Sequence, residues 1–144
     1  IIWSCQMLFQ AIVISIFLGA MVFGTAFVAP IAISTLGETH AGSFLRKYWV
    51  VYHRLGLFGS LFLLILFLAA TAIWQTISTS IILSSLVTVS AICFFFGLRL
   101  IPNINAARDA GQEDRFKRLH LIDVILVGLA QLAIIATIIG TVTL

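Results

Sequence analysis

Several ionisable side chains lie at the edges of long apolar segments, where a charge is costly. His53 and Arg54 come about one turn into a predicted membrane helix, and Arg99 comes about one turn before the next one ends. His120 and Asp123 begin the last apolar segment and, three positions apart, share one helix face. Such groups usually face the bundle interior, pair with one another and mark functional sites. An ion pair of Asp123 with Arg54 or Arg99 would hold three helices in register, and the alternative is a polar binding site.

The two histidines suggest a second chemistry. His53 and His120 are expected at similar depth on different helices, which is the minimum arrangement for a b-type haem with two axial histidines. The same two side chains could also ligate a metal ion. Each ring could equally donate a hydrogen bond to a backbone carbonyl or lie at the level of the lipid headgroups. We expect no bound cofactor, and haem b stays open as the alternative.

The sequence contains no set of residues typical of catalysis. It has no Ser-His-Asp arrangement, no phosphate-binding loop and no HExxH pattern. Cys5 and Cys93 lie in different apolar segments and form no CxxC pair, so neither a disulfide framework nor a zinc site is indicated. We therefore expect a protein that is not an enzyme.

The distribution of charge shows which elements must position these side chains. Of the 144 residues, 62% are hydrophobic and only 9% are charged. The eight Lys and Arg and five Asp and Glu residues fall into two clusters, at 38–54 and 99–123, and the ranges 1–37, 55–98 and 124–144 carry no charge. Soluble domains average about a quarter charged residues. A water-soluble enzyme is therefore excluded.

The uncharged ranges have the lengths of membrane spans. A helix of about 20 apolar residues crosses about 30 Å of hydrocarbon, which predicts four spans at about 5–36, 49–74, 80–104 and 115–143. The range 61–70 is apolar on every side, unlike the alternating pattern of a membrane strand. A polar-rich turn at 74–80 separates the two middle spans. We predict a single all-α domain over 1–144, an integral membrane four-helix up-down bundle.

The positive charges predict the orientation of this bundle. All eight Lys and Arg residues lie around two connections that share one side of an up-down bundle. Because short cytoplasmic loops are enriched in Lys and Arg, we expect the loops 37–54 and 99–123 in the cytoplasm and both termini outside. The expected location is the plasma membrane, the bacterial inner membrane. The net charge of +3 is then explained by the basic loops and their contact with anionic lipid, and it indicates no nucleic-acid partner.

Small residues recur at spacings that let membrane helices approach closely. The predicted helix-packing positions are Gly19, Gly24, Gly56 and Ser60. Pro30 is expected to kink or end the first helix, and Gly37 to cap it. The residues from Glu38 to Lys47 mix charged and apolar types, which predicts a short interfacial amphipathic helix between spans 1 and 2.

Four motifs follow one another along nearly the whole chain: FGTAFVAP at 23–30, YHRLG at 52–56, PNINAARD at 102–109 and FKRLH at 116–120. In this order they resemble a family of small four-span membrane proteins catalogued as a domain of unknown function, similar to a vertebrate transmembrane protein linked to drug resistance. The resemblance implies a four-span fold and a link to metal or drug tolerance, but no reaction. The family's polar signature falls on Asn105, Arg108, Asp109 and His120. The family carries other residue types at His53 and Asp123, so the resemblance implies no role for these two.

Three functions are open on these grounds. The leading hypothesis is a non-enzymatic accessory or stabilising subunit of a larger membrane complex, because the bundle has short loops, small-residue faces and no catalytic set. The runner-up is a small transporter or metal- or drug-tolerance protein with a cytoplasmic-side polar site, and the third is a bis-histidine haem electron-transfer subunit. The expected partners are the lipid bilayer and membrane-protein subunits. The predicted polar cluster comprises Arg54, Arg99, Asn105, Arg108, Asp109, His120 and Asp123.

Overall fold

Four long apolar helices pack against one another, which confirms the prediction of an all-α membrane bundle. The computed structural model describes residues 2–71 and 77–143. Helix α1 (Ile2–Phe23) continues through a π-helical turn, η1 (Gly24–Val28), into α2 (Ala29–Thr71), and α3 (Ile77–Asp109) and α4 (Glu113–Thr143) follow. The stretches long and apolar enough to cross a membrane are Met7–Gly37, Thr39–Ala70, Thr79–Asp109 and Glu113–Thr143. Of the turn predicted at 74–80, positions 74–76 lie outside the described residues, and α3 already begins at Ile77.

Pro30 does not end the first span. The helical turn before it widens to the π form, in which the Ala29 N–H donates to the Gly24 carbonyl. Proline has no N–H, and its ring crowds the carbonyl four residues earlier. A single π turn inside an α-helix is a common way to accommodate such an interruption. The first span therefore runs on to Gly37.

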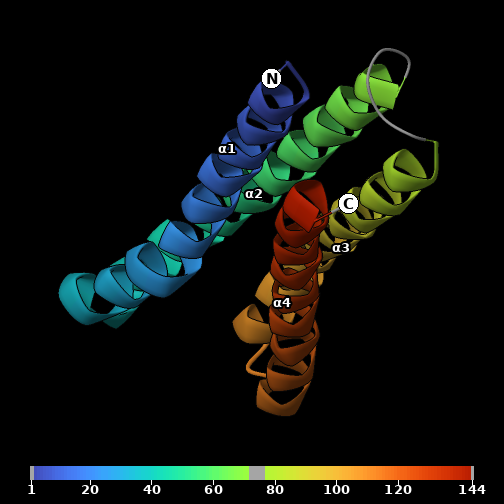
Figure 1. Ribbon diagram of the computed structural model, residues 1–144. Helices are drawn as coiled ribbons and strands as arrows, with labels where there is room; N and C mark the ends of the chain where they lie inside the picture. Colours follow the sequence, from blue (N-terminus) through green and yellow to red (C-terminus); the bar gives the residue numbers. More distant parts are fainter. Residues whose placement is uncertain (1, 72–76, 144) are drawn as a thin grey trace.

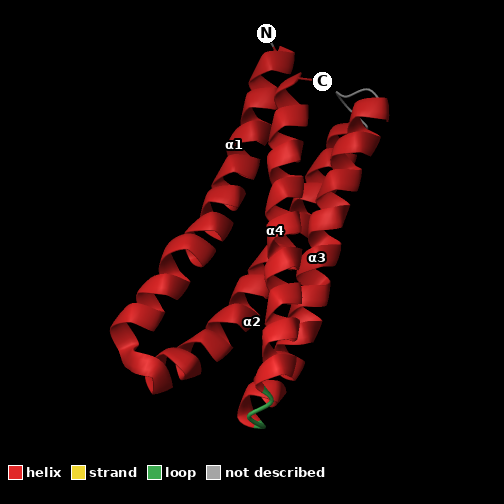
Figure 2. Cartoon of the chain, turned by 90° about the horizontal axis from the view of Figure 1, so that it is seen from below, coloured by secondary structure: helices red, strands yellow, loops and turns green. Residues whose placement is uncertain are grey.

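The chain reverses direction between the first and second spans (Figure 2). The reversal falls at Gly37, whose φ of 66° and ψ of 164° are disfavoured for any residue with a Cβ. After Gly37 the helix continues to Thr71 with no further non-helical residue. The prediction of a separate surface helix at 38–47 is therefore wrong, because these residues are the first turns of the helix that forms the second span. A continuous helix satisfies the backbone N–H and C=O groups as the chain enters the membrane.

Helix α3 extends beyond its predicted end at 104 and contains Pro102 in its interior. It ends at Asp109 in a Schellman turn, in which the Gln112 N–H donates to the Ala107 carbonyl over 2.9 Å and Gly111 takes a φ of 66°. Glu113 and Asp114 then occupy the first turn of α4, near the positive end of its dipole. This short turn sets the end of α3 beside the start of α4.

The helices pack around α3, which lies along both α2 and α4 (Figure 1). Helix α1 packs chiefly on α4. Two buried layers, each with residues from all four helices, fill the bundle. One layer contains Ile14, Leu63, Phe67, Leu83, Val87 and Ile134, and the other contains Met21, Tyr52, Cys93, Phe94, Val127 and Ala130. Between the layers, the hydroxyls of Ser60 and Ser90 form a hydrogen bond of 3.0 Å. Large apolar side chains such as Ile16 and Phe62 remain exposed on the outer faces, as a lipid environment requires.

Both charged clusters lie at one end of the bundle. The Arg46 guanidinium forms two hydrogen bonds with the Asp109 carboxylate, from Nη1 to Oδ2 over 2.9 Å and from Nη2 to Oδ1. This ion pair joins the part of α2 that follows Gly37 to the end of α3. The start of α1 and the end of α4 lie toward the opposite end (Figure 2).

Candidate functional site

A cavity of about 600 Å³ lies at the charged end of the bundle. It opens between η1 and the first turns of α2 on one side and the junction of α3 with α4 on the other. Its volume is in the range of about 300–1,000 Å³ that is typical of small-molecule sites. Most of its wall is apolar, and the charged, imidazole and amide side chains in the wall are Arg46, Asn105, Arg108, His120, Asp123 and Gln131.

Four members of the predicted polar cluster meet in this cavity. Asn105 and Arg108 lie three positions apart near the end of α3, and His120 and Asp123 lie three positions apart near the start of α4. Residues with this spacing share one helix face. Because the Schellman turn folds α4 back along α3, the two faces border the same space.

A stack of planar groups forms one part of the cavity wall. The Arg108 guanidinium carbon lies 5.5 Å from the centroid of the Phe116 ring, a cation–π contact. The Phe116 and His120 rings are nearly parallel, with an interplanar angle of 3° and 5.7 Å between centroids. The stack positions Arg108 through its planar face, so its N–H groups stay available to a ligand in the cavity.

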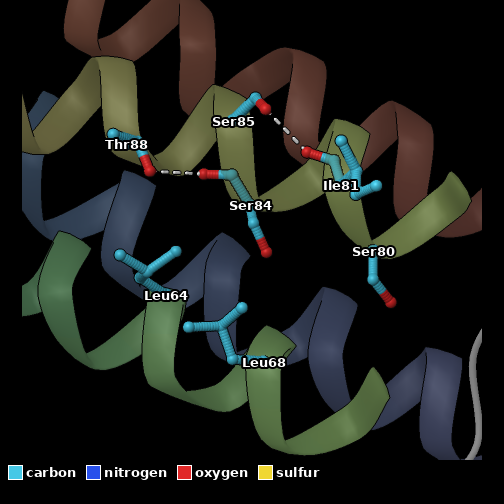
Figure 3. Close-up of a pocket in the computed structure, with 7 residues that line it drawn as sticks. All are labelled: Leu64, Leu68, Ser80, Ile81, Ser84, Ser85 and Thr88. Carbon is cyan, nitrogen blue, oxygen red and sulfur yellow. Dashed lines mark hydrogen bonds between the residues drawn. The ribbon is translucent and has the colours of Figure 1, made fainter. Parts of the chain in front are cut away.

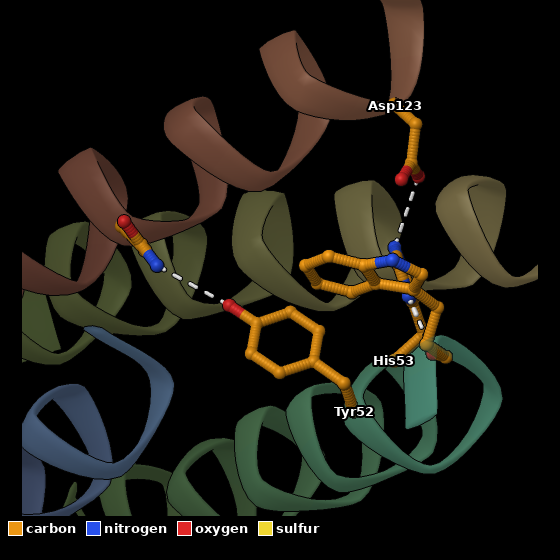
Figure 4. A network of polar contacts seen from close by, with 5 residues as sticks. Tyr52, His53 and Asp123 are labelled. Carbon is orange, nitrogen blue, oxygen red and sulfur yellow. Dashed lines mark hydrogen bonds and ion pairs between the residues drawn. The ribbon is translucent and has the colours of Figure 1, made fainter. Parts of the chain in front are cut away.

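The side chain of Asp123 pairs with His53 deep in the bundle (Figure 4). His53 Nε2 lies 3.0 Å from Asp123 Oδ1, and His53 Nδ1 lies 2.8 Å from the backbone carbonyl oxygen of Trp49. The His53 side chain is fully buried and that of Asp123 is 10% exposed. The pair therefore joins α2 to α4, and its carboxylate also borders the cavity.

The predicted ion pairs of Asp123 with Arg54 or Arg99 are wrong. Both arginines are exposed on the outside of the bundle. Adjacent residues on a helix point about 100° apart, so Arg54 points outward when His53 points inward. A long arginine side chain can also extend along the helix and place its charged end among the headgroups.

Gly97 on α3 provides the space for this pair. A Cβ at position 97 would lie 2.5 Å from His53 Cδ2 and Nε2 and 2.9 Å from Asp123 Oδ1. These distances are far below van der Waals contact. The absence of a side chain at Gly97 thus lets the imidazole and the carboxylate meet against the backbone of α3.

A second polar network lies one layer further into the bundle. The Gln131 amide Nε2 donates to Tyr52 Oη over 3.2 Å and to Thr25 Oγ1 over 3.3 Å. The Tyr52 hydroxyl in turn donates to the Met21 carbonyl over 3.3 Å. The network links α1, η1, α2 and α4, and Gln131 and Thr25 also line the cavity.

The remaining predicted site residues lie elsewhere. Asp109 is exposed and pairs with Arg46 at the rim. Both ring nitrogens of His53 have hydrogen-bond partners, so in this arrangement the ring offers no free nitrogen to a haem iron. Among the described residues, no three His, Cys, Asp or Glu side chains converge as a metal site.

Of the four predicted packing residues, three make close contacts in the bundle and one does not. A Cβ at Gly24 would collide with the Tyr48 hydroxyl, and one at Gly56 would lie 2.5 Å from the Phe94 ring. Ser60 is buried in its hydrogen bond to Ser90. Gly19 differs, because no heavy atom lies within 4 Å of a Cβ built there. Gly19 therefore makes no close packing contact within this bundle, and its packing against a partner helix stays a prediction.

A second groove of about 500 Å³ lies between α2 and the start of α3, away from the charged end (Figure 3). Leucines 64 and 68 and several hydroxyl side chains line it. The Ser85 and Thr88 hydroxyls donate to carbonyls of their own helix, each over 2.7 Å. The groove contains no ionisable side chain in its described wall, and we therefore place the candidate site at the charged end.

Sequence reasoning missed several residues that shape the site. Arg46 carried only a weak signal, since nothing in the first charged cluster indicates which of its side chains turns toward the cavity. Gly97 carried none, because a single glycine in a membrane helix is common. The sequence could not distinguish His53 from its neighbour Arg54 as the partner of Asp123.

Comparison with known families gives one match. Residues 12–113 match the model of a family described as "Domain of unknown function (DUF4149)". The matched region covers the second half of α1, all of η1, α2 and α3, and the first residue of α4. No curated protein and no solved structure matches the chain.

Proposed function

The chain belongs to the DUF4149 family of unknown function, and from this premise we propose that it is a small membrane carrier for amphipathic anions. The observation that supports the proposal is the cavity of about 600 Å³ at the charged end, in which an apolar wall surrounds a few polar groups. Such a combination is typical of sites for small organic molecules. This is the transporter hypothesis, with a ligand class assigned from the cavity wall. The motif resemblance to a drug-resistance protein stays a prediction.

The charges in the wall favour an anionic ligand. Arg46 is already paired with Asp109 at the rim, and Asp123 is paired with His53. Arg108 is held by the face of Phe116 and retains its N–H groups. A guanidinium binds sulfonate, phosphate or carboxylate groups through charge-assisted hydrogen bonds. We place the anionic group of the ligand at Arg108, with His120 beside it.

The apolar part of the wall suits a hydrocarbon body. Ile33, Leu45, Val124 and Val127 contribute aliphatic surface, and Trp49 contributes an indole ring. These side chains come from α2 and α4, which both border the cavity. A ligand with one anionic group and a short aliphatic or aromatic body would satisfy both parts of the wall.

Binding of decanesulfonate to the protein in phosphatidylcholine nanodiscs tests this proposal. We expect saturable binding above that of empty nanodiscs, and Arg108→Gln should weaken it by about tenfold, because a hydrogen bond to a charged group contributes about 1.5–3 kcal/mol. Arg115→Gln is the matched control, because Arg115 is exposed and bonds to Gln112 outside the cavity. Equal binding of decyltrimethylammonium, or equal affinity of Arg108→Gln and wild type, would contradict the proposal. Competition by added phosphatidylglycerol would identify a lipid headgroup as the source of the anion.

The accessory-subunit hypothesis has one observation in its favour. The exposed face of α1 around Gly19 is small and open, and such faces let another helix approach closely. Purification in a gentle detergent distinguishes the two functions. Co-migration with a large complex that is lost in Gly19→Leu supports a subunit, and a free protein under conditions that keep other complexes intact contradicts it.

The charged end is proposed to face the cytoplasm of a bacterial cell, because it holds every Lys and Arg residue. Single cysteines in a Cys5→Ser, Cys93→Ala background test this orientation. An impermeant maleimide should label Thr143→Cys in intact cells and label Gln112→Cys only after lysis. The reverse pattern would place the cavity on the outer side.

A further inference from the structure

The hydrogen bonds of His53 define where its protons lie. Nδ1 faces the Trp49 carbonyl oxygen at 2.8 Å, and a carbonyl only accepts, so Nδ1 carries a proton and donates it. Nε2 faces Asp123 Oδ1 at 3.0 Å. A neutral ring protonated at Nδ1 has a lone pair at Nε2, and an ionised carboxylate has only lone pairs. A second proton must therefore lie between Nε2 and Oδ1, and the pair is neutral overall whichever atom carries it.

Loss of that shared proton would change the charge of the cavity wall. The pair would become negative, with a nitrogen lone pair directed at a carboxylate inside the bundle. His53 is fully buried, so little water can screen the charge. Because Asp123 also lines the cavity, the new negative charge would face any bound ligand. An anion in the cavity and the shared proton therefore favour each other's binding.

We propose that the His53–Asp123 pair is a proton-binding site, so that the cavity takes up an amphipathic anion together with a proton. The inference rests on the proposed function for its ligand. By thermodynamic reciprocity, a proton that tightens anion binding is itself held more tightly when the anion is bound. The proton comes from the bulk solution, and no bond other than that to hydrogen is made or broken.

The other ionisable groups near the pair come from three helices. On α2, Tyr52 packs against the His53 ring, and Arg46 lies at the rim in its pair with Asp109. On α3, the contacts to the His53 ring are Phe94 and Gly97, which do not ionise, and Arg108 lies in the cavity wall. On α4, His120 lies in the wall one turn before Asp123. The residues of α1 and η1 in the described wall carry no ionisable side chain. His120 is therefore the competing titratable group, since its protonation would also favour an anion.

Decanesulfonate is a suitable probe because its sulfonate stays ionised throughout the titration. We would measure its affinity for the protein in nanodiscs from about pH 5 to about pH 9, a range that covers buried carboxyl and imidazole groups. Calorimetric titrations in buffers of different ionisation enthalpy would count the protons taken up on binding. For the wild type we expect uptake of a proton and a fall in affinity of up to about tenfold per pH unit on the alkaline side.

Two variants separate the pair from His120. In Asp123→Asn the side-chain amide can donate to His53 Nε2 without any shared proton. We therefore expect no proton uptake by the pair, and the alkaline fall in decanesulfonate affinity that the pair causes should be lost. In His120→Gln, whatever its affinity, proton uptake and the alkaline fall should persist. Wild-type binding without proton uptake, or uptake that is lost in His120→Gln and kept in Asp123→Asn, would overturn the proton site while the anion carrier stands. Absence of saturable binding at every pH would instead contradict the proposed function. The wild-type proton count remains decisive if Asp123→Asn does not fold.

Discussion

Replacing Gly97 by alanine should disrupt the buried pair that joins α2 to α4. The added Cβ would lie 2.5 Å from two atoms of the His53 ring and 2.9 Å from Asp123 Oδ1. The ring cannot swing away without cost, because it is fully buried and both nitrogens are bonded. Overpacking of this kind lowers the free energy of unfolding by about 1–3 kcal/mol.

Gly19→Ala is the matched control, since a Cβ at Gly19 meets no heavy atom within 4 Å. Both changes gain the same helix propensity of alanine over glycine, about 1 kcal/mol at most, and this gain cancels in the comparison. Unfolding in mixed detergent micelles should therefore show Gly97→Ala less stable than Gly19→Ala by about 1–3 kcal/mol. Equal stability of the two variants would refute the close packing of the pair against α3.

A double-mutant cycle checks the cause of that difference. In a His53→Ala background the ring that the new Cβ would strike is absent. The destabilisation by Gly97→Ala should then shrink to that of the Asp123 contact alone, giving a coupling of about 0.5–3 kcal/mol between positions 53 and 97. If the effect of Gly97→Ala were the same in both backgrounds, its origin would lie in the helix and not in the pair.

Three further perturbations follow from the other buried contacts. Asp123→Ala leaves the His53 Nε2 without its partner and should lower the free energy of unfolding by about 1–3 kcal/mol, and Asp123→Asn should lower it less; equal effects would contradict the bond to Nε2. Tyr52→Phe and Gln131→Leu remove the two ends of one hydrogen bond, so a cycle should give a coupling of about 0.5–1.5 kcal/mol, and additive effects would contradict it. Ser60→Ala should cost about 0.6 kcal/mol for the lost bond between α2 and α3, measured in the same micelles. Ser85→Ala, whose hydroxyl bonds to its own helix, should have no comparable effect.

The composition was enough to predict a bundle of membrane helices, because a charged side chain is costly in the hydrocarbon core and the spans must therefore be long uncharged ranges. The uncharged ranges had the lengths of spans, and the structure has four apolar helices, although the second stretch begins at Thr39 and the third ends at Asp109, outside the predicted 49–74 and 80–104. The irregular features were harder to place. The π turn before Pro30 and the reversal at Gly37 depend on local backbone geometry. A proline or a glycine is compatible with a kink, a helix end or a turn, so the sequence alone did not distinguish these conformations.

The sequence predicted the location of the site better than the contacts between its side chains. Spacing placed His120 and Asp123 on one face, the predicted cluster also included Arg108, and these three residues do line one cavity. Arg54 and Arg99 were assigned to the same interior because their depth matched. Depth along a helix follows from counting residues, whereas the direction of each side chain depends on rotation about the helix axis.

The choice between His53 and Arg54 as partner of Asp123 shows what determines that rotation. The two are adjacent, so a rotation of α2 by about 100° would exchange them. On the face that turns inward, Tyr52, His53, Gly56 and Ser60 are all buried, and their partners on α3 are Phe94, Gly97 and Ser90. An arginine in place of His53 would have to fit its longer side chain against Gly97 and leave donors unsatisfied, whereas on the outside it reaches the headgroups. The rotation of α2 is thus set by the small residues at its contact with α3, and the buried His53–Asp123 pair follows from helix packing.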